Sequence, residues 1–255
     1  MAGRVVTVSV VIPVRDDAVA LERCLRSLAR QRLAPLEVIV VDNGSRDASA
    51  AVAAAAGARV VSEPRPGIAA AASRGYDAAR GEVIARCDAD SVLPSDWIAR
   101  IAARMAADPD LHAVTGGGRF YDLPRGWRTL AGTVYLGAYF LLTHAAVGHT
   151  ALWGSNMALR RDAWRDLRDL VHRFDAEVHD DMDLAFQLGP SRRPVYDRRL
   201  RVGVSARSLR GRHQLRRRFR RACHTLAVNW QQQPPWTRWR ARLLPRPRSS
   251  PAARM

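Results

Sequence analysis

The chain has 255 residues, of which 47% are hydrophobic and 25% charged, and a chain of this size buries a core without disulfides or a structural metal. Its three cysteines, Cys24, Cys87 and Cys223, are widely spaced and odd in number, which excludes a disulfide scaffold and suits a reducing compartment. Residues 191–255 contain 19 arginines and one acid, whereas residues 1–190 contain 22 arginines and 23 acids. The basic C-terminal part therefore predicts contact with a polyanionic surface, either acidic lipid or nucleic acid.

The first part of the chain alternates between β-branched apolar runs and helical patterns. Runs such as VVTVSVVIPV and EVIVV are typical of strands buried on both faces. The first residues show no signal-peptide pattern, and we expect no secretory signal. Strands alternating with helices predict βαβ units and a mostly parallel sheet with helices on both faces. The predicted strands are residues 5–14, 37–41, 59–62 and 82–86, and the predicted helices are 18–30, a stretch ending at 56, and 68–80.

The second half has a weaker pattern. We expect a helix over 94–107, a strand or loop over 113–121, and a helix starting near 179. Residues 129–153 are apolar, but histidines, threonines and glycines interrupt them, so a buried or interfacial amphipathic segment is favoured over a membrane-spanning helix. Periodicity is lost after two prolines at 234 and 235, and the last ten or so residues are expected to be disordered.

Polar side chains follow several predicted strands. Arg15, Asp42, Asp88 and Asp90 come after the first, second and fourth strands, and such ends meet at the edge of a parallel sheet where ligands bind. Two carboxylates one residue apart on an extended segment share a face, and their hard oxygen atoms suit Mg²⁺ or Mn²⁺. A turn or a helix cap would explain the same Asp-x-Asp spacing, and an Asx-turn would explain Asp42.

A third acidic cluster, Asp180, Asp181 and Asp183, opens the predicted helix near residue 179. Negative charge at a helix N-terminus is stabilising, which accounts for one or two of these acids. Three acids within four residues also repel one another, and in such a cluster one carboxylate can act as a base. The sequence has neither a GxGxxG after the first strand nor a GxxxxGK[ST], which disfavours a dinucleotide-binding domain and a P-loop.

Taken together, VSVVIPVRDD, EVIVVDNGSRD, ARGEVIARCDADSVLPSDW, GSNMALRRDAW and HDDMDLAFQL resemble a family 2 glycosyltransferase of the GT-A fold over roughly residues 7–200. The resemblance implies an α/β enzyme that transfers a sugar, with inversion, from a nucleotide-diphosphate donor to an acceptor hydroxyl, with Mn²⁺ or Mg²⁺ as cofactor. It implies that Pro13, Arg15 and Asp42 line the nucleotide pocket, that Asp88 lies beside the ribose and the metal, that Asp90 ligates the metal, and that Asp181 is the catalytic base.

The chain departs from that family at two places. Relatives often have an arginine at the position of Ala72, and Arg74 or Arg86 are the candidates to replace it. Some relatives supply a metal-binding histidine after the last core strand, where this chain has Ser205, so we assign no histidine ligand. A rival interpretation is a non-catalytic nucleotide- or nucleic-acid-binding protein on a degraded transferase fold. The two intact acidic clusters argue against it.

The expected organisation is a glycosyltransferase domain over residues 1–205 and an arginine-rich, helical extension over 206–255. The extension admits three interpretations: a solvated helix face, docking to an anionic membrane, and nucleic-acid binding. Docking is favoured because tryptophans accompany the arginines, and it would suit a lipid-linked or cell-envelope acceptor. Nucleic acid is the least favoured partner. We therefore expect a cytoplasmic protein peripheral to the inner face of the cell membrane.

Overall fold

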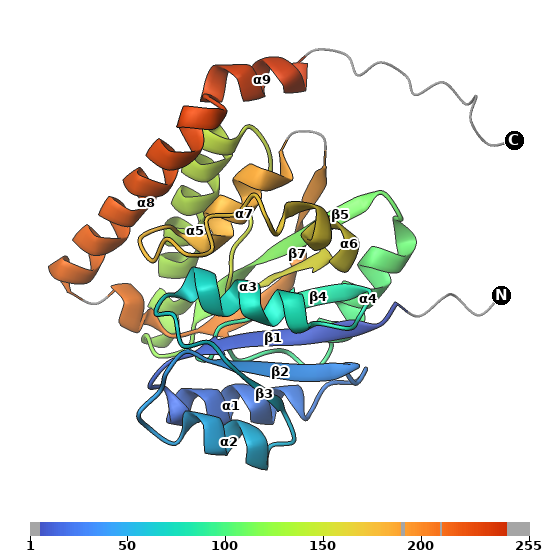
Figure 1. Cartoon of the computed structure of the whole chain (residues 1–255). Coiled ribbons are helices and arrows are strands. Elements are labelled where there is room, and N and C mark those ends of the chain that lie inside the picture. The colour runs from blue at the N-terminus through green and yellow to red at the C-terminus, as the bar shows by residue number, and fades with distance from the viewer. Residues whose placement is uncertain (1–5, 190–191, 210, 244–255) are drawn as a thin grey trace, which may run out of the picture.

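The computed structural model describes residues 6–189, 192–209 and 211–243. One seven-stranded sheet runs through the molecule in the order β3-β2-β1-β4-β6-β5-β7 (Figure 1). The strands are β1 (Val8–Val14), β2 (Glu37–Asp42), β3 (Arg59–Ser62), β4 (Val83–Arg86), β5 (Leu111–Phe120), β6 (Met157–Arg160) and β7 (Arg193–Val204). The helices are α1 (Ala18–Leu28), α2 (Ser49–Ala55), α3 (Ile68–Ala78), α4 (Trp97–Ala107), α5 (Arg125–Val147), α6 (Arg161–Leu167), α7 (Asp180–Leu188), α8 (Arg212–Gln232) and α9 (Pro235–Leu243), with a 3₁₀ turn at Ala206–Leu209.

The sheet is mostly parallel, as the sequence predicts. Neighbouring strands from β3 to β4 are parallel, β7 is parallel to β5, and β6 alone runs antiparallel to both of its neighbours. Because β6 is reversed, its first residue, Met157, lies opposite Arg86 at the carboxyl end of β4. The residues just before β6 therefore reach the sheet edge at which the polar groups were expected.

Helices cover both faces of the sheet over two apolar cores. Side chains of α1, α2 and α4, with Leu21 and Trp97 among the fully buried ones, pack on one face. Side chains of α3, α6 and α7, with Tyr76 and Trp164 in edge contact, pack on the other. Cys24 and Cys87 are buried free thiols in the first core. Both layers are visible in Figure 1, with α1 and α2 below the sheet and α3 above it.

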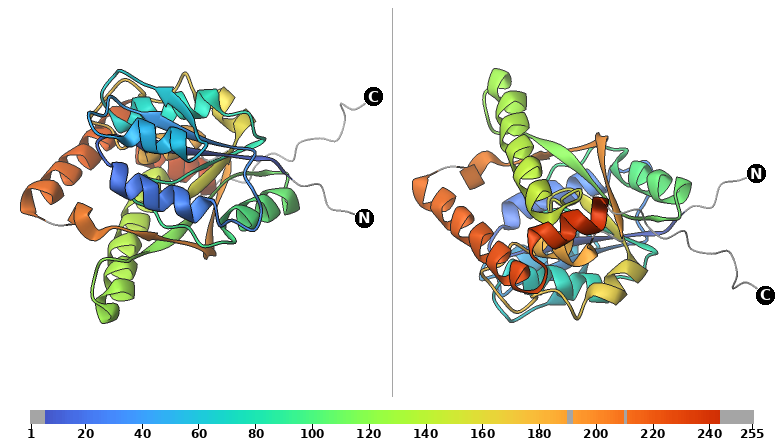
Figure 2. Two further views of the ribbon diagram at one scale, coloured as in Figure 1. Left: turned by 90° about the horizontal axis from the view of Figure 1, so that it is seen from below. Right: turned by 90° about the horizontal axis from the view of Figure 1, so that it is seen from above.

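The apolar segment near residue 129 belongs to α5, which lies along the side of the molecule and projects beyond the sheet in both views of Figure 2. It ends at Gly148, whose φ of 80° is the left-handed conformation that closes many helices. Among the described residues, no helix has the length and apolar character needed to cross a bilayer.

The basic C-terminal part begins as a strand and continues as helices. Its first residues form β7, an edge strand, so the sequence pattern missed a strand there. Two further helices follow, α8 and α9, and Pro235 is the first residue of α9, a position that suits proline because its missing N–H is not needed there. The segment expected to be disordered lies outside the described residues.

Candidate active site

The carboxyl end of β1 contributes to a pocket of about 360 Å³. Pro13 and Arg15, two residues expected to line a nucleotide pocket, line it together with Gly67 at the start of α3. Arg217 and Arg221 of α8 line the same pocket. The strand end and the basic C-terminal extension therefore share one cavity, although about two hundred residues separate them in the sequence.

Asp42 ends β2 at the same edge, and its neighbour Asn43 lines the pocket. Oδ1 of Asp42 accepts the N–H of Ser45, three residues on, at 3.2 Å, so its side chain closes a turn one residue longer than the Asx-turn that the sequence allowed. The side chain of Asn43 donates to the carbonyl of Arg65 at 2.6 Å and accepts the N–H of Gly67 at 2.9 Å. Asn43 thereby fixes the loop that opens α3, and Asp42 shapes the turn beside it.

Asp88 is held where β4 ends. The hydroxyl of Ser155 donates to Oδ2 of Asp88, and Nη2 of Arg86 lies 3.3 Å from Oδ1. The N–H of Asp88 donates to Oγ of Ser91 at 3.2 Å. Ser155 comes from the segment that precedes β6, and the reversed direction of β6 is what brings it to this edge.

Asp181 is fixed by the residue next to Ser155. The N–H of Gly154 donates to Oδ2 of Asp181 at 2.9 Å, and the N–H of Met182 donates to Oδ1 at 2.8 Å. Consecutive residues 154 and 155 thus bind Asp181 and Asp88, which lie 93 positions apart in the sequence. The two acidic clusters that the sequence singled out therefore meet at one place.

Arg86, the last residue of β4, contacts both acidic clusters. Its side chain is 2% exposed and forms ion pairs with Asp180 and Asp88. Burial raises the pKa of Asp180 to about 6, and the positive charge of Arg86 opposes that rise. A Cβ at Gly154 would lie 2.5 Å from the guanidinium group of Arg86, so a larger residue here would push that group out of its present ion pairs.

The third acid of the cluster has a structural role. Asp183 is buried, and its Oδ1 lies 2.8 Å from Nδ1 of His172 and accepts the amide of Asn229 of α8 at 2.8 Å. Each acid of the first turn of α7 therefore has different partners, which relieves the repulsion that the sequence predicts for three acids in four residues.

Asp90 faces a cation from the C-terminal part. Nε of Arg207, in the 3₁₀ turn after β7, lies 3.2 Å from Oδ2 of Asp90, and the same guanidinium group pairs with Asp17. Burial, followed by the nearby charge of Asp88, raises the pKa of Asp90 to about 6, and Arg207 opposes this rise. Ser205, at the position where some relatives have a histidine, instead donates to Asp122 at 2.8 Å.

The donor set at the end of β4 fits a hard divalent cation that brings ligands of its own. Asp88 and Asp90 provide carboxylate oxygens, which suit Mg²⁺ and Mn²⁺. In the described part of the chain, no group of three or more acids, histidines or cysteines is placed to hold a metal. A cation here would complete its shell with phosphate oxygens and water, which is how Mg²⁺ is commonly held.

The expected replacements for the arginine missing at Ala72 are not where the sequence suggested. Ala72 is buried within α3, Arg74 is exposed, and Arg86 is consumed by its ion pairs. Besides Arg15, the arginines that line the pocket are Arg217 and Arg221, which the sequence shows only as part of a basic extension. No local signal marked them, because their role depends on where α8 packs.

Two tryptophans of the extension form hydrogen bonds to α5. The indole N–H groups of Trp230 and Trp239 donate to the carbonyls of Ala146 and Ala145 in the last turn of α5, at 3.4 and 2.9 Å. Arg242 donates to the carbonyl of Gly148 at 2.7 Å. These contacts satisfy carbonyls at the end of α5 and leave Trp236, which is 71% exposed, as the free tryptophan of α9 among the described residues.

The family model "Glycosyl transferase family 2" matches residues 9–168. This chain belongs to glycosyltransferase family 2. An uncharacterized glycosyltransferase of Mycobacterium tuberculosis is 34% identical over 168 residues, which cover 66% of this chain and 72% of that protein. An undecaprenyl-phosphate 4-deoxy-4-formamido-L-arabinose transferase of Pseudomonas fluorescens is 32% identical over 130 residues, which cover 47% of this chain and 38% of that protein.

Solved structures share the GT-A architecture. A mannosyltransferase of Pyrobaculum calidifontis, solved with GDP-Man and Mn²⁺, superposes with a TM-score of 0.70 at 22% identity, covering 92% of this chain and 68% of that one. Glucosyl-3-phosphoglycerate synthase of Mycobacterium tuberculosis, solved with Mn²⁺, UDP and glucosyl-3-phosphoglycerate, superposes with a TM-score of 0.59 at 22% identity, covering 88% of this chain and 80% of that one. These likenesses confirm the fold predicted from the sequence.

Proposed function

We propose that this protein is an inverting, metal-dependent glycosyltransferase that moves a sugar from a nucleotide-diphosphate donor to an acceptor hydroxyl. The observation that carries the proposal is the pair of bonds from Gly154 to Asp181 and from Ser155 to Asp88. They hold the carboxylate expected to accept a proton next to the carboxylate expected to bind the donor. The structural neighbours solved with Mn²⁺ and GDP-Man or UDP support the same donor class.

In this proposal the nucleoside lies against Pro13 and Arg15, near the turn that Asp42 forms. Asp88 would hold the ribose and the metal, and Asp90 would hold the metal, which when bound stabilises charge on the departing diphosphate as a Lewis acid. Arg217 and Arg221 would provide the phosphate contacts that Ala72 does not.

Asp181 acts as the base. Each of its oxygens accepts one backbone N–H and keeps a lone pair for a further hydrogen, so the carboxylate is oriented and still able to accept a proton. It removes the proton of the acceptor hydroxyl as that oxygen attacks the anomeric carbon, and the bond to the diphosphate oxygen breaks on the opposite face. The separate carboxylates explain why two acidic clusters are needed.

The acceptor and the cellular location belong to the same proposal. A lipid-linked or cell-envelope acceptor is supported by the similarity to a transferase named for undecaprenyl phosphate. We place the protein in the cytoplasm, peripheral to the inner face of the membrane. Nucleic acid is not favoured as a partner, because Arg207 and Arg220 of the extension already pair with acidic groups of the protein itself.

The test is hydrolysis of a panel of nucleotide sugars with Mn²⁺ by the wild type and by Asp90→Ala, with Asp122→Ala as a control for loss of one carboxylate outside the donor set. We expect slow release of the nucleoside diphosphate from at least one donor, lost in Asp90→Ala and retained in the control. Equal rates for the wild type and Asp90→Ala would contradict the proposal.

A further inference from the structure

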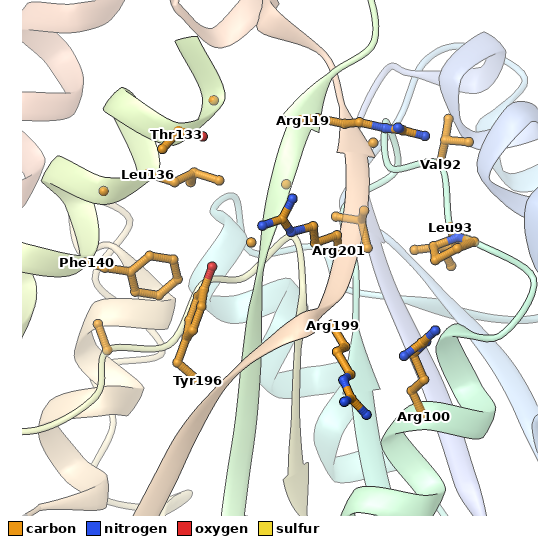
Figure 3. Close-up of a pocket in the computed structure, with 18 of the residues that line it drawn as sticks. Val92, Leu93, Arg100, Arg119, Thr133, Leu136, Phe140, Tyr196, Arg199 and Arg201 are labelled. Carbon is orange, nitrogen blue, oxygen red and sulfur yellow. The ribbon is translucent and has the colours of Figure 1, made fainter. Parts of the chain in front are cut away.

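A second, larger cavity lies away from the nucleotide pocket, between α5 and the β5–β7 edge of the sheet. Its volume is about 970 Å³. One wall is the helix α5, from which Leu136, Phe140 and Leu141 face the cavity, and the other wall carries arginines from α4, β5 and β7. Figure 3 shows Arg201 extending from β7 toward α5. The cavity thus combines an apolar side with a cationic side.

The arginines of this cavity are Arg100, Arg119, Arg199 and Arg201. Arg100 pairs with Asp96 at 2.7 Å. Within the described residues, the other three guanidinium groups have no carboxylate partner, and Nε of Arg201 donates only to a backbone carbonyl at 3.2 Å. Guanidinium groups without a carboxylate partner give the cavity a positive charge, and each of them has the planar fork that binds a phosphate group.

The arginines of β7 that line the cavity lie in and next to a β-bulge. The register of β5 and β7 shifts between Gly116, opposite Asp197, and Gly117, opposite Arg201, so three residues of β7 have no opposite residue. The carbonyl of Leu200 within this bulge accepts the side-chain amide of Asn156 at 2.9 Å. A β-bulge leaves its extra residues without a partner in the ladder; Arg199 lies within this bulge, Arg201 is the first residue paired after it, and both line the cavity.

The cavity opens beside an exposed apolar stripe on α5. Trp127, Leu130, Val134 and Leu141 recur at spacings of three, four and seven residues and are each more than half exposed, and Leu141 also lines the cavity. An exposed contiguous apolar surface of this kind marks an interaction site. Next to a row of cations, it has the composition of a helix that lies in the interface of an anionic bilayer.

We infer that this cavity binds the phosphate-bearing head of an anionic membrane lipid, while the apolar stripe of α5 enters the adjoining acyl region. The inference deepens the proposed function, on which it rests for the link to a lipid-borne acceptor. It moves membrane docking from the tail to this face, because Trp230 and Trp239 are already bonded to α5. The cavity also adjoins the proposed donor centre, since Tyr121, one of its lining residues, donates to the carbonyl of Asp90 at 3.1 Å.

The experiment is co-sedimentation of the full chain with phosphatidylcholine vesicles, with and without phosphatidic acid. Arg199→Gln/Arg201→Gln removes two cavity charges, and Arg216→Gln/Arg240→Gln removes two exposed charges from α8 and α9 as a matched control. Each arginine near an anionic surface adds to the free energy of binding, so the cavity variant, which lacks two of them, is expected to lose about 30-fold in affinity for the anionic vesicles. The control is expected to lose less than about threefold, because its charges lie outside the cavity. Equal losses in both variants would overturn the inference.

A second pair of measurements tests the occupant. Leu130→Ser/Leu141→Ser, with folding checked by circular dichroism, is expected to weaken vesicle binding and to have the same oligomeric state as the wild type. A wild-type dimer that this variant dissociates, together with no vesicle binding, would show that a second copy covers the stripe and would overturn the inference. In calorimetry, soluble short-chain phosphatidic acid is expected to bind the wild type and not the cavity variant. Inorganic phosphate binding as tightly as the lipid would also overturn it.

The vesicle-binding experiment and the hydrolysis experiment that tests the proposed function can fail independently. Vesicle binding requires no nucleotide sugar, and hydrolysis of the donor requires no vesicle. A wild type that binds phosphatidic acid but hydrolyses no nucleotide sugar contradicts the proposed function alone, whereas hydrolysis without lipid binding contradicts this inference alone.

Discussion

The two halves of the chain contribute to the site in different ways. In the first half, Arg15, Asp42 and Asp88 reach the site because each lies at or just after the end of a strand, and the parallel register of β2, β1 and β4 sets their order. In the second half, Asp181 and Arg207 reach it through bonds to distant segments. Local sequence therefore specifies the donor side of the site, whereas tertiary contacts specify the side that carries the proposed base.

The buried ion pair between Arg86 and Asp180 connects the two halves. Removing it is expected to have the largest effect on stability. Arg86→Met keeps the volume of the side chain and leaves Asp180 buried without its cation. Removing one partner of a buried ion pair costs about 3–5 kcal/mol, so the free energy of unfolding should fall by that amount in a urea titration. Arg74→Met, at an exposed position of α3, is the control and should stay within about 0.5 kcal/mol. An Arg86→Met protein as stable as the control would contradict this link.

The attachment of α9 to the body gives a pH-dependent test of intermediate size. His149 is buried, with Nε2 3.4 Å from Nη2 of Arg238, and burial lowers its pKa to about 4. The unfolded chain therefore binds a proton at this histidine between about pH 6.5 and pH 4 that the folded chain does not, so stability falls as the pH falls. Between pH 8 and pH 5 this histidine should lower the free energy of unfolding by about 2 kcal/mol.

His149→Gln removes that titration, and its loss of stability over the same pH range should be smaller than that of the wild type by about the same amount. Thermal melts in matched buffers measure the difference. His213→Gln, which changes an exposed histidine of α8, should follow the wild type. Parallel curves for the wild type and His149→Gln would show that this histidine does not link pH to the packing of α9.

The weakest link is the contact from Arg207 to Asp90. Arg207→Gln removes a positive charge 3.2 Å from a carboxylate that is expected to bind the metal, so Mn²⁺ should bind more tightly in the absence of nucleotide. Because the Arg207 side chain is about half exposed, the pair is expected to be worth up to about 1 kcal/mol, which corresponds to about fivefold in Kd by calorimetry. Unchanged or weaker Mn²⁺ binding would mean that Arg207 does not compete for Asp90.

The same contrast explains how far the sequence could be interpreted. The strands from β1 to β4 were predictable because apolar runs and the polar residues that follow them are local patterns. The placement of Gly154 and Ser155 was not, because it depends on the antiparallel direction of β6. The arginines of α8 at the nucleotide pocket and those of β7 in the large cavity were visible only as net charge, because the packing of α8 and of β7 against distant segments decides which cavity each of them lines.

The most direct test compares donor binding and turnover in Asp181→Asn, an exchange that keeps the shape of the side chain and removes its capacity to accept a proton. General-base catalysis contributes about 10²–10⁴-fold in rate. With a donor that the wild type hydrolyses or transfers, we predict a loss of turnover of that size, while the Kd of the donor with Mn²⁺ in calorimetry changes by less than about threefold. Turnover close to that of the wild type would contradict the assignment of Asp181 as the base.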